Sequence, residues 1–459
     1  MSEAKREIAS VLRDLGGQIR GAILRPEDET FEAARRVWNA AIDRRPAAIV
    51  VCADANDVAL ALRAAVEHGV PVTVRGGGHN VAGRALADGS LLLDLSRMRR
   101  VTVDARSQIA VVQGGALWRD VDAATAEHGL ATTGGLISST GVGGLTLGGG
   151  TGWLMRRHGL AIDNLVGATV VLADGRIVHA SVDEHASLFY ALRGGAGGFG
   201  VVTSFEFKVH PLRDVLAGVI IRPAADARTT LREFRDFALQ APDDYCGMIV
   251  LTAAPPLPFL DSAWHGRPVA IHAVCWTGDV AAGQRALEPL RRSGTVLADH
   301  IGPMPYVQWQ HLLDAGAPPG RHNYWKTASY AGLGEPTIEV LAQAVNNPPS
   351  RLTEIHVQHL GGAVARIPEA DTAFSARSAQ FFINVIGMTD LSDEFAVLRV
   401  RVRDLYDQLA PESLSSLLPN FTNEDDGDVT ARFGAPQRAR VQSIQRQYDP
   451  SGVFATLSR

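Results

Sequence analysis

The sequence has few cysteines and no excess of positive charge. Cys52, Cys246 and Cys275 are its three cysteines, and they lie far apart among 459 residues. An odd and widely spaced set does not fit the disulfide framework of a small secreted protein. Lysine and arginine number 44 against 49 aspartates and glutamates, whereas a protein that binds duplex nucleic acid normally carries a basic excess. We therefore expect no nucleic-acid partner.

Long apolar runs are also lacking. No uninterrupted apolar segment approaches the ~20 residues that a membrane-spanning helix needs. Residues 1–19 mix charged and apolar side chains throughout, which favours an amphipathic helix over a signal peptide. We expect a cytoplasmic protein with no membrane partner, present as a monomer or a homodimer.

Glycine, in contrast, is abundant and clustered. VRGGGHNVAG (74–83) directly follows the predicted strand VPVTVR, and GVGGLTLGGGTG fills residues 141–152. Glycine loses more backbone entropy on folding than any other residue, so such runs persist where the chain needs positive φ or comes close to a ligand. Backbone N–H groups of such turns bind anions, and the pyrophosphate of a dinucleotide is the usual one. A linker is the alternative for 141–152, but the apolar residues recurring within it favour an ordered cradle.

Two common nucleotide motifs are tested and rejected. GAGGFG at 195–200 matches the Rossmann pattern G-x-G-x-x-G. It follows a predicted helix and precedes a predicted strand, which is the reverse of the order that the Rossmann motif requires. The sequence contains no G-x-x-x-x-G-K-[ST], so nothing points to nucleotide hydrolysis.

The pattern of strands and helices changes near residue 213. Before it, short strands such as AAIVVCA (47–53) alternate with helices, including a helix from Asp57, the predicted N-cap, towards Gly69. VGATVVLADGRIVHAS (166–181) predicts a hairpin that turns at Asp174-Gly175. After residue 213, longer strands alternate with helices, which is typical of an α+β domain with an antiparallel sheet backed by helices.

Several motifs in one order carry a family resemblance. VRGGGHNVAG, the run 141–165, the ADG hairpin, LRGGAGGFGVVTSFEFKV and RQYDPSGVF (446–454) follow one another along the chain. Together they are similar to the FAD-linked oxidases of the vanillyl-alcohol oxidase superfamily, in its berberine-bridge-enzyme-like branch. The resemblance implies an α+β fold with an FAD-binding domain of the PCMH type (1–212), a substrate-binding domain (213–412) and a C-terminal segment (413–459) that returns to the first domain.

The resemblance also implies a covalent cofactor. In that family the histidine of the R-x-G-G-H motif is bonded to the 8α-methyl carbon of the flavin, and His79 occupies this position. Without the family, a loop histidine bonded to backbone or water is the simpler interpretation. The implied FAD-binding residues are Arg75, Gly76, Gly77, Gly78, His79, Asn80, Gly83, Ser139, Thr140, Gly141, Gly143, Gly144, Gly149, Gly152, Asp163 and Val202.

The sequence departs from the family at four places. A second, cysteinyl link in many relatives would fall at Ile137, so we expect a single tether through His79. Leu418 replaces the tyrosine of Y-x-N-F, although Asn420 and Phe421 match. Gly198 stands where relatives have asparagine, and the chain ends ATLSR instead of an N-x-N-like tail. These changes leave the catalytic base unassigned.

Residues 353–360, TEIHVQHL, offer a replacement. Alternation along a strand places Glu354, His356 and Gln358 on one face, and in this family that sheet covers the flavin with its polar face. His356 is then a candidate base, since imidazole titrates near neutrality, with Gln358 as a second cavity residue; a solvated strand histidine is the alternative. His359 points to the other face, so no metal shared with His356 is expected.

Three further residues complete the catalytic candidates. In NYWKT (323–327), Tyr324 fits an aromatic wall or the core, and Lys326 fits a partner for an anionic reduced flavin or a solvated charge. Asn420 is the third candidate, because it matches the family motif.

The cofactor determines the expected function. A flavin accepts a hydride from a substrate carbon, while the protein supplies position and electrostatics. We expect an FAD-dependent oxidase that acts on a C–H bond beside an alcohol oxygen or an amine nitrogen of a small molecule, with dioxygen as acceptor and hydrogen peroxide as product. The alternatives are a dehydrogenase, a tailoring enzyme of secondary metabolism that cyclises or oxygenates, and a flavin-carrying protein whose chemistry has degraded.

Overall fold

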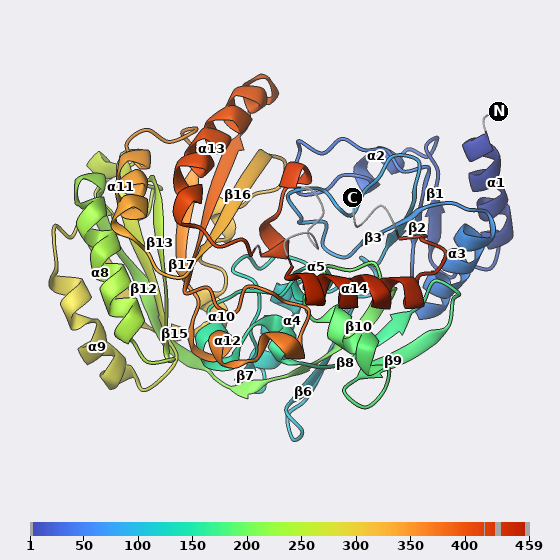
Figure 1. Cartoon of the computed structure of the whole chain (residues 1–459), viewed down its shortest axis with the longest axis horizontal. Coiled ribbons are helices and arrows are strands. Elements are labelled where there is room, and N and C mark those ends of the chain that lie inside the picture. The colour runs from blue at the N-terminus through green and yellow to red at the C-terminus, as the bar shows by residue number, and fades with distance from the viewer. Residues whose placement is uncertain (1–2, 417, 427–432, 455–459) are drawn as a thin grey trace.

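A computed structural model describes residues 3–416, 418–426 and 433–454. The elements are arranged along one long axis, with helix α1 at one end and a large helix-covered sheet at the other (Figure 1). Two smaller sheets lie between these ends. The chain therefore combines helices with mainly antiparallel sheets, and the predicted α+β class is confirmed.

The first sheet has four strands in the order β1-β2-β4-β3. Strands β2, β3 and β4 are parallel, and β1 runs antiparallel to β2. Short apolar runs such as LLLD form it because helices α1 and α3 pack nearby and bury them. Its elements are α1 (Glu3–Leu15), β1 (Ala22–Leu24), α2 (Phe31–Ala34), β2 (Ala48–Val51), α3 (Ala55–Glu67), β3 (Val72–Arg75) and β4 (Leu91–Asp94).

The N-cap of α3 is Asp54 and not Asp57, as the sequence had predicted. The Asp54 side chain accepts hydrogen bonds from the backbone N–H groups of Asn56 and Asp57. Asp57 lies inside the first turn, where its buried carboxylate accepts hydrogen bonds from the backbone N–H groups of Arg20 and Gly21. A carboxylate near a helix start thus serves a long-range contact that sequence spacing does not reveal.

The second sheet has five antiparallel strands in the order β5-β6-β10-β8-β9. The predicted hairpin is present as β8 and β9, with Gly175 at φ +78° in its turn. Helix α14 returns from the C-terminal part of the chain and packs against α7. The elements are β5 (Val101–Asp104), β6 (Ile109–Gln113), α4 (Trp118–Ala126), α5 (Val142–Leu147), α6 (Met155–His158), β8 (Leu165–Val171), β9 (Ile177–Ser181), α7 (Ala186–Leu192), β10 (Val201–Lys208) and α14 (Ala435–Tyr448); β7 (Leu130–Ala131) pairs with β11 (His210–Pro211).

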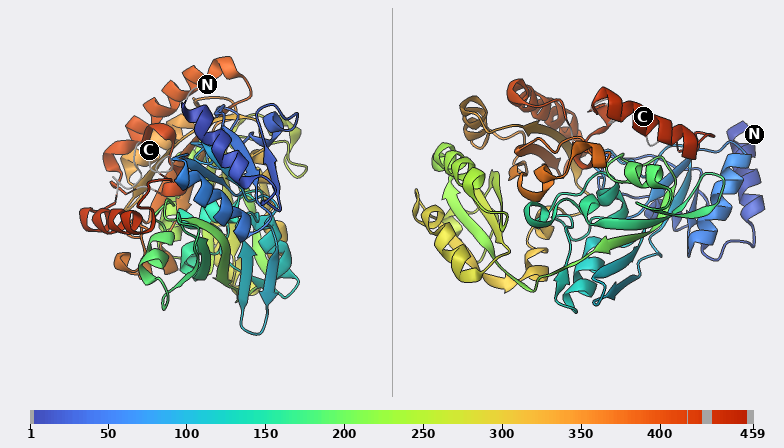
Figure 2. Two further views of the ribbon diagram at one scale, coloured as in Figure 1. Left: turned by 90° about the vertical axis from the view of Figure 1, so that its right-hand side faces the viewer. Right: turned by 60° about the horizontal axis from the view of Figure 1, so that its bottom comes forward.

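The third sheet has seven antiparallel strands in the order β15-β12-β14-β13-β17-β18-β16. Helices α8, α9, α11 and α13 lie along its outer face (Figures 1 and 2). The elements are β12 (Asp214–Pro223), α8 (Ala227–Gln240), β13 (Tyr245–Ala253), β14 (Pro268–Trp276), α9 (Val280–Arg292), β15 (Ala298–Pro305), α10 (Tyr306–Trp309), β16 (His322–Tyr330), α11 (Glu335–Ala344), β17 (Glu354–His359), α12 (Gly362–Arg366), β18 (Phe381–Thr389) and α13 (Phe395–Leu409).

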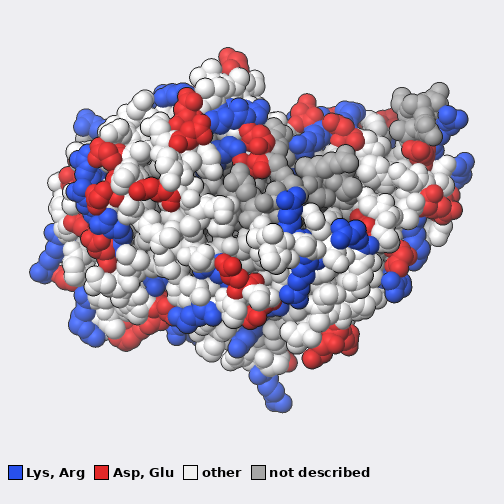
Figure 3. Space-filling view, viewed as in Figure 1, with Lys and Arg blue, Asp and Glu red and all other residues white. Residues whose placement is uncertain are grey.

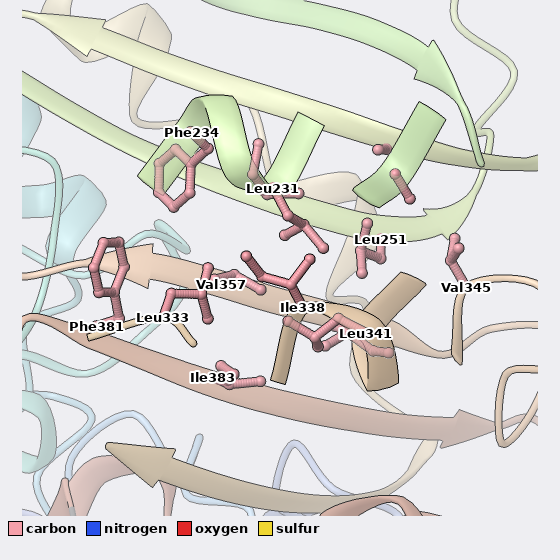
Figure 4. Packing of buried hydrophobic residues seen from close by; sticks show 14 of the residues in the cluster. Leu231, Phe234, Leu251, Leu333, Ile338, Leu341, Val345, Val357, Phe381 and Ile383 are labelled. Atoms are coloured by element: carbon pink, nitrogen blue, oxygen red, sulfur yellow. The ribbon is translucent and has the colours of Figure 1, made fainter. Parts of the chain in front are cut away.

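Both faces of the seven-stranded sheet are covered, because all nine residues of β18 are buried. On the outer face, Phe234 and Ile338 from the helices meet Val357 and Ile383 from the strands (Figure 4). Full burial of each such side chain contributes about 1.5–3 kcal/mol to stability. The inner face packs against Trp153 and its neighbours from the first half of the chain. The sheet is thereby held against the part of the molecule that carries the glycine loops.

None of the helices in the described ranges combines the length and the apolar character that crossing a membrane requires. Charged side chains of both signs are interspersed over the face shown in Figure 3. That face presents no continuous basic surface among its described residues.

Candidate functional site

A cavity of about 680 Å³ lies between the glycine loops and the inner face of the seven-stranded sheet. Three loop segments line one side, at residues 76–80, 140–148 and 196–202. Residues from strands β12, β13, β14, β16, β17 and β18 line the other side. The cavity thus joins the two halves of the chain, which is a common place for a ligand site.

The first two loops cross each other backbone to backbone. A Cβ atom at Gly77 would lie 2.5 Å from the backbone nitrogen of Gly141, and a Cβ atom at Gly141 would lie 2.3 Å from that of Gly77. Gly78 adds a positive φ of +65°. Any larger residue would push these loops apart, so the glycines are required for the shape of the cradle.

The third loop follows α7 and precedes β10. It contains Gly194, Gly197, Gly198 and Gly200, all with φ between +89° and +145°, and Ala196 at +66°. Runs of such backbone form concavities that hold anions. Sequence analysis rejected this segment as a Rossmann motif for its order of elements, and the structure has that same helix-to-strand order. The loop nevertheless lines the cavity. None of its residues was predicted to bind the cofactor; only Val202, in the adjoining strand β10, was.

His79 lies at the end of the first loop, half-buried in the cavity wall. Its ring stacks on Trp38, with 4.3 Å between ring centroids and 16° between planes. Its Nε2 atom is buried and has no hydrogen-bond partner among the described residues. Burial lowers the pKa of His79 to about 4, so the imidazole is neutral at physiological pH.

Ten of the sixteen predicted cofactor residues line the cavity, and six do not. Arg75 forms an ion pair with Asp94 at 2.6 Å, and Asp163 forms a buried pair with Arg377 at 2.7 Å. The residues that line it are Gly76, Gly77, Gly78, His79, Asn80, Thr140, Gly141, Gly143, Gly144 and Val202. The residues outside the lining are Arg75, Gly83, Ser139, Gly149, Gly152 and Asp163.

The three glycines among these outlying residues are each packed too closely against another part of the chain for a larger side chain. A Cβ atom at Gly152 would lie 1.7 Å from the carbonyl oxygen of Gly134. At Gly83 it would meet Ile42, and at Gly149 it would meet the ring of Phe374. These glycines shape the cradle from behind.

Strand β17 brings a carboxylate and an imidazole to the sheet side of the cavity. His356 Nε2 lies 2.8 Å from a carboxylate oxygen of Glu354, and both residues line the cavity. Asn384 lies opposite His356 in the register of β17 and β18, and also lines the cavity. Thr327 donates a hydrogen bond to the Asn384 side-chain oxygen at 3.0 Å. These groups form one polar strip on a wall that is otherwise mostly apolar.

Gln358 does not reach this strip. It lies farther along β17, is 1% exposed, and is absent from the cavity lining. In the strand register, Gln358 lies opposite Met248 of β13 and Phe382 of β18, and both of these residues belong to an apolar cluster. The shared strand face was predicted correctly, but the cavity ends before Gln358.

Tyr324 and Lys326 also lie outside the cavity lining, against the prediction. Alternation along β16 brings their neighbour Trp325 to the cavity and turns these two side chains away. The Tyr324 hydroxyl donates to Asp425 at 2.6 Å, and Lys326 Nζ lies 3.1 Å from the same carboxylate. Both residues therefore bind the C-terminal part of the chain.

We define the C-terminal strap as residues 418–426. Its residues Pro419, Asn420 and Phe421 line the cavity. The side-chain oxygen of Asn420 accepts a hydrogen bond from the backbone N–H of Gly150 at 3.1 Å. Its side-chain nitrogen donates one to the carbonyl oxygen of Leu145 at 2.9 Å. The strap thus contacts the glycine cradle at one end and the seven-stranded sheet at the other.

The sheet end of the strap is held by charge. Arg403 donates to Asp425, and Lys326 donates to Asp425 and to Asp426. Burial alone would raise the pKa of Asp425, but hydrogen bonds from Tyr324, Arg403 and Lys326 outweigh it and hold the pKa well below its ordinary value. Asp425 is therefore ionised across the neutral and mildly acidic range.

Replacing Asp425 by asparagine should lower the free energy of unfolding by about 1–3 kcal/mol, because hydrogen bonds to a charged acceptor are lost. A carboxylate whose pKa is lowered by folding contributes fully above its ordinary pKa of about 3.9, and the contribution declines as the pH falls below that value. Denaturant unfolding at pH 7, 5 and 3.5 measures this dependence. Asp393→Asn, at an exposed position, is the control and should change stability by less than about 0.5 kcal/mol. Equal stabilities for the two variants at pH 7 would contradict the role of Asp425.

Comparison with known proteins agrees with this geometry. The FAD binding domain family matches residues 46–181. (R)-6-hydroxynicotine oxidase of Paenarthrobacter nicotinovorans is 40% identical over 456 residues, which cover 95% of each chain. An FAD-linked oxidoreductase of Dictyostelium discoideum is 28% identical over 99% of this chain and 97% of its own.

Solved structures have the same fold. The 6-hydroxy-D-nicotine oxidase of Arthrobacter nicotinovorans superposes with a TM-score of 0.85 over 95% of this chain and 96% of its own, with 27% of residues identical in that superposition. A berberine-bridge-enzyme-like protein of Physcomitrella patens reaches 0.87 over 98% and 97%, at 19% identity.

The fold and the glycine cradle define a flavoprotein, and the residues present fit FAD. Three glycine-containing loops form the cradle, and His79 brings to the cavity a buried ring nitrogen that has no partner among the residues that the structure describes. The chain belongs to the FAD-linked oxidoreductases of the vanillyl-alcohol oxidase superfamily, and is similar to its nicotine oxidases and berberine-bridge-enzyme-like proteins. It is an FAD-dependent oxidoreductase.

Proposed function

We propose that this protein is an FAD-dependent oxidase whose flavin is bonded once, through His79. It would oxidise a C–H bond beside an alcohol oxygen or an amine nitrogen of a small molecule, and dioxygen would serve as the acceptor. The main support is the state of His79: a neutral imidazole in the cavity wall, whose buried Nε2 has no hydrogen-bond partner within the described part of the chain. Such a ring is a nucleophile at neutral pH and is already free of competing hydrogen bonds at that atom.

The positions of the cysteines support a single bond. Ile137, where many relatives have a linking cysteine, lines the cavity with an apolar side chain. Cys52 is buried in the core of the four-stranded sheet, and Cys246 and Cys275 are buried in the seven-stranded sheet. None of the three is among the residues that line the cavity.

The polar strip on the sheet supplies the proton chemistry. When bound, FAD accepts the hydride. In this proposal His356, which lines the cavity, would take the proton from the hydroxyl or ammonium group of the substrate. His356 Nε2 lies 2.8 Å from the Glu354 carboxylate. If Nε2 carries the proton and donates it to that carboxylate, Nδ1 is the nitrogen that would receive the proton of the substrate. Leu418, where relatives have tyrosine, is buried in an apolar cluster, so this scheme does not need a base from the strap.

The walls around the strip favour a mostly apolar substrate. Val250, Ile271, Ile386 and Met388 line the cavity from the sheet, and Leu257 lines it from the loop after β13. Apolar walls with a few placed polar groups are typical of small-molecule sites. Residues 1–212 would hold the FAD, residues 213–412 would hold the substrate, and the segment 413–459 would return to the first domain through the strap.

The first test uses the wild-type protein. Acid precipitation should give a yellow pellet, and the intact mass of the chain should rise by one FAD. A colourless pellet beneath a yellow supernatant would contradict the covalent bond.

A second measurement tests the oxidase chemistry. Alcohols and amines with apolar bodies are mixed anaerobically with the protein, and the flavin absorbance is followed. A donor that bleaches the flavin should also release hydrogen peroxide when air is admitted. Bleaching that persists in air until an artificial acceptor is added would support a dehydrogenase instead. A flavin that dithionite bleaches but that no donor in the panel bleaches would support degraded chemistry.

A further inference from the structure

Trp38 is fixed against His79 by contacts from both halves of the chain. It lies in the loop between α2 and β2, is 7% exposed, and lines the cavity. Its backbone N–H donates to the carbonyl oxygen of Gly78 at 3.1 Å, and its indole Nε1 donates to that of Ala317 at 3.0 Å. The edge of Trp325 packs on it with centroids 5.6 Å apart and planes at 68°. The indole therefore has one defined position.

This position determines the surroundings of the His79 imidazole. The indole covers one face of that ring in a stacked arrangement, at 4.3 Å. Burial is the main cause of the lowered pKa of His79, and the indole covers one face of the buried ring. A hydrogen bond with the backbone of His79 itself opposes this effect, and the charge of the Asp314 carboxylate opposes it less strongly. The Asp314 carboxylate accepts a hydrogen bond from the Ser138 hydroxyl at 2.6 Å, and it lies 2.8 Å from Nδ1 of His311.

We propose that Trp38 is a positioning residue for the attachment of the flavin: its indole holds the His79 imidazole in one orientation and out of water, ready for bond formation. The inference rests on the proposed covalent link. It extends that proposal, because no motif of the sequence points to Trp38 and the indole acts only through His79.

Attachment of the flavin would join the His79 imidazole to the cofactor through one new carbon–nitrogen bond. A bond forms between a ring nitrogen of His79 and the 8α-methyl carbon, and one C–H bond of that methyl group breaks. The proton of that C–H bond and the N–H proton of the imidazole leave to solvent, and the electron pair of the broken C–H bond remains on the flavin ring. Dioxygen then takes two electrons and two protons to give hydrogen peroxide. Only a neutral imidazole has the lone pair that this step requires, so hydration and protonation of His79 oppose it.

Full-length protein produced without flavin and then mixed with FAD in air tests the proposal. The rate at which acid-stable flavin appears is measured between pH 5 and pH 8. Wild-type protein should attach the flavin at a nearly constant rate over this range, because His79 stays neutral above about pH 4. Trp38→Ala should attach it at least tenfold more slowly at pH 8. In that variant the rate should also fall by about tenfold per pH unit below about 6.5, the ordinary pKa of histidine.

Controls separate the possible causes. The native flavin content before acid treatment should be unchanged in Trp38→Ala, because the glycine cradle is intact. Trp38→Phe keeps a flat ring and should restore most of the rate. Trp38→Leu excludes water without stacking, so attachment should slow while its independence of pH remains; this variant also serves if Trp38→Ala does not fold. Wild-type rates and a wild-type pH profile in both the Ala and the Leu variants would overturn the proposal. A wild-type protein without acid-stable flavin would instead contradict the proposed function.

Discussion

Replacing His356 by alanine should slow the reduction of the bound flavin by about 10²–10⁴-fold, the usual contribution of a general base. The measurement is anaerobic stopped-flow bleaching with whichever donor reduces the wild-type flavin. The free energy of unfolding should change by only about 1 kcal/mol, because His356 is half-buried and makes one side-chain hydrogen bond, to Glu354. A large kinetic loss with a small stability loss is the expected result.

Two variants make that result specific. Glu354→Gln keeps an acceptor for His356 but removes the charge, so reduction should slow by less than in His356→Ala. His128→Ala removes an exposed histidine that is not among the residues lining the cavity, and should leave the rate unchanged. Unaltered reduction kinetics in His356→Ala would show that the base lies elsewhere.

Replacing His79 by alanine should release all of the flavin into the acid supernatant. The native protein should remain yellow, because the glycine loops that form the cradle keep their close contacts without this side chain. Acid precipitation, flavin absorbance of the pellet and intact mass measure the outcome. The variant should also hold a flavin of lower electron affinity, since the covalent bond raises it.

His128→Ala is also the control for the His79 experiment. His128→Ala should give a yellow pellet and a chain heavier by one FAD. A yellow pellet from His79→Ala would mean that another residue carries the flavin. A native variant without any flavin would mean that the His79 bond, and not the cradle, holds the cofactor in place.

Much of the fold could be predicted from periodicity. The hairpin at Asp174-Gly175 and the helix-backed antiparallel sheet were identified because their patterns are local. The start of α3 was placed wrongly, at Asp57 instead of Asp54. Two aspartates three residues apart both satisfy the N-cap preference, and only the long-range bonds of Asp57 to Arg20 and Gly21 distinguish them.

The cradle was more predictable than the substrate side. Glycine runs mark close backbone approach, and ten of the sixteen residues that the family implied line the cavity. Arg75 and Asp163 are held in ion pairs with Asp94 and Arg377. A motif predicts which residue type stands at a position. It does not predict whether that side chain forms an ion pair with another residue of the chain instead of contacting the cofactor.

Alternation alone could not decide the catalytic candidates. The pattern of β16 separates Trp325 from Tyr324 and Lys326, but it does not tell which face meets the cavity. That choice follows from Asp425, almost 100 residues away in sequence, which binds Tyr324 and Lys326 on the other face. Trp38 was missed for the same reason. Its loop has no regular secondary structure over residues 36–47, and its partners lie at Gly78 and Ala317.

The C-terminal strap also sets an order of events during synthesis. The ribosome delivers the glycine loops first, whereas Asn420 and Phe421, which line the same cavity, are synthesised more than 200 residues later. A nascent chain can therefore present a cradle that is open on the strap side, but it cannot enclose a cofactor there. A chain synthesised only as far as residue 418 therefore lacks the part of the cavity lining that Pro419, Asn420 and Phe421 supply.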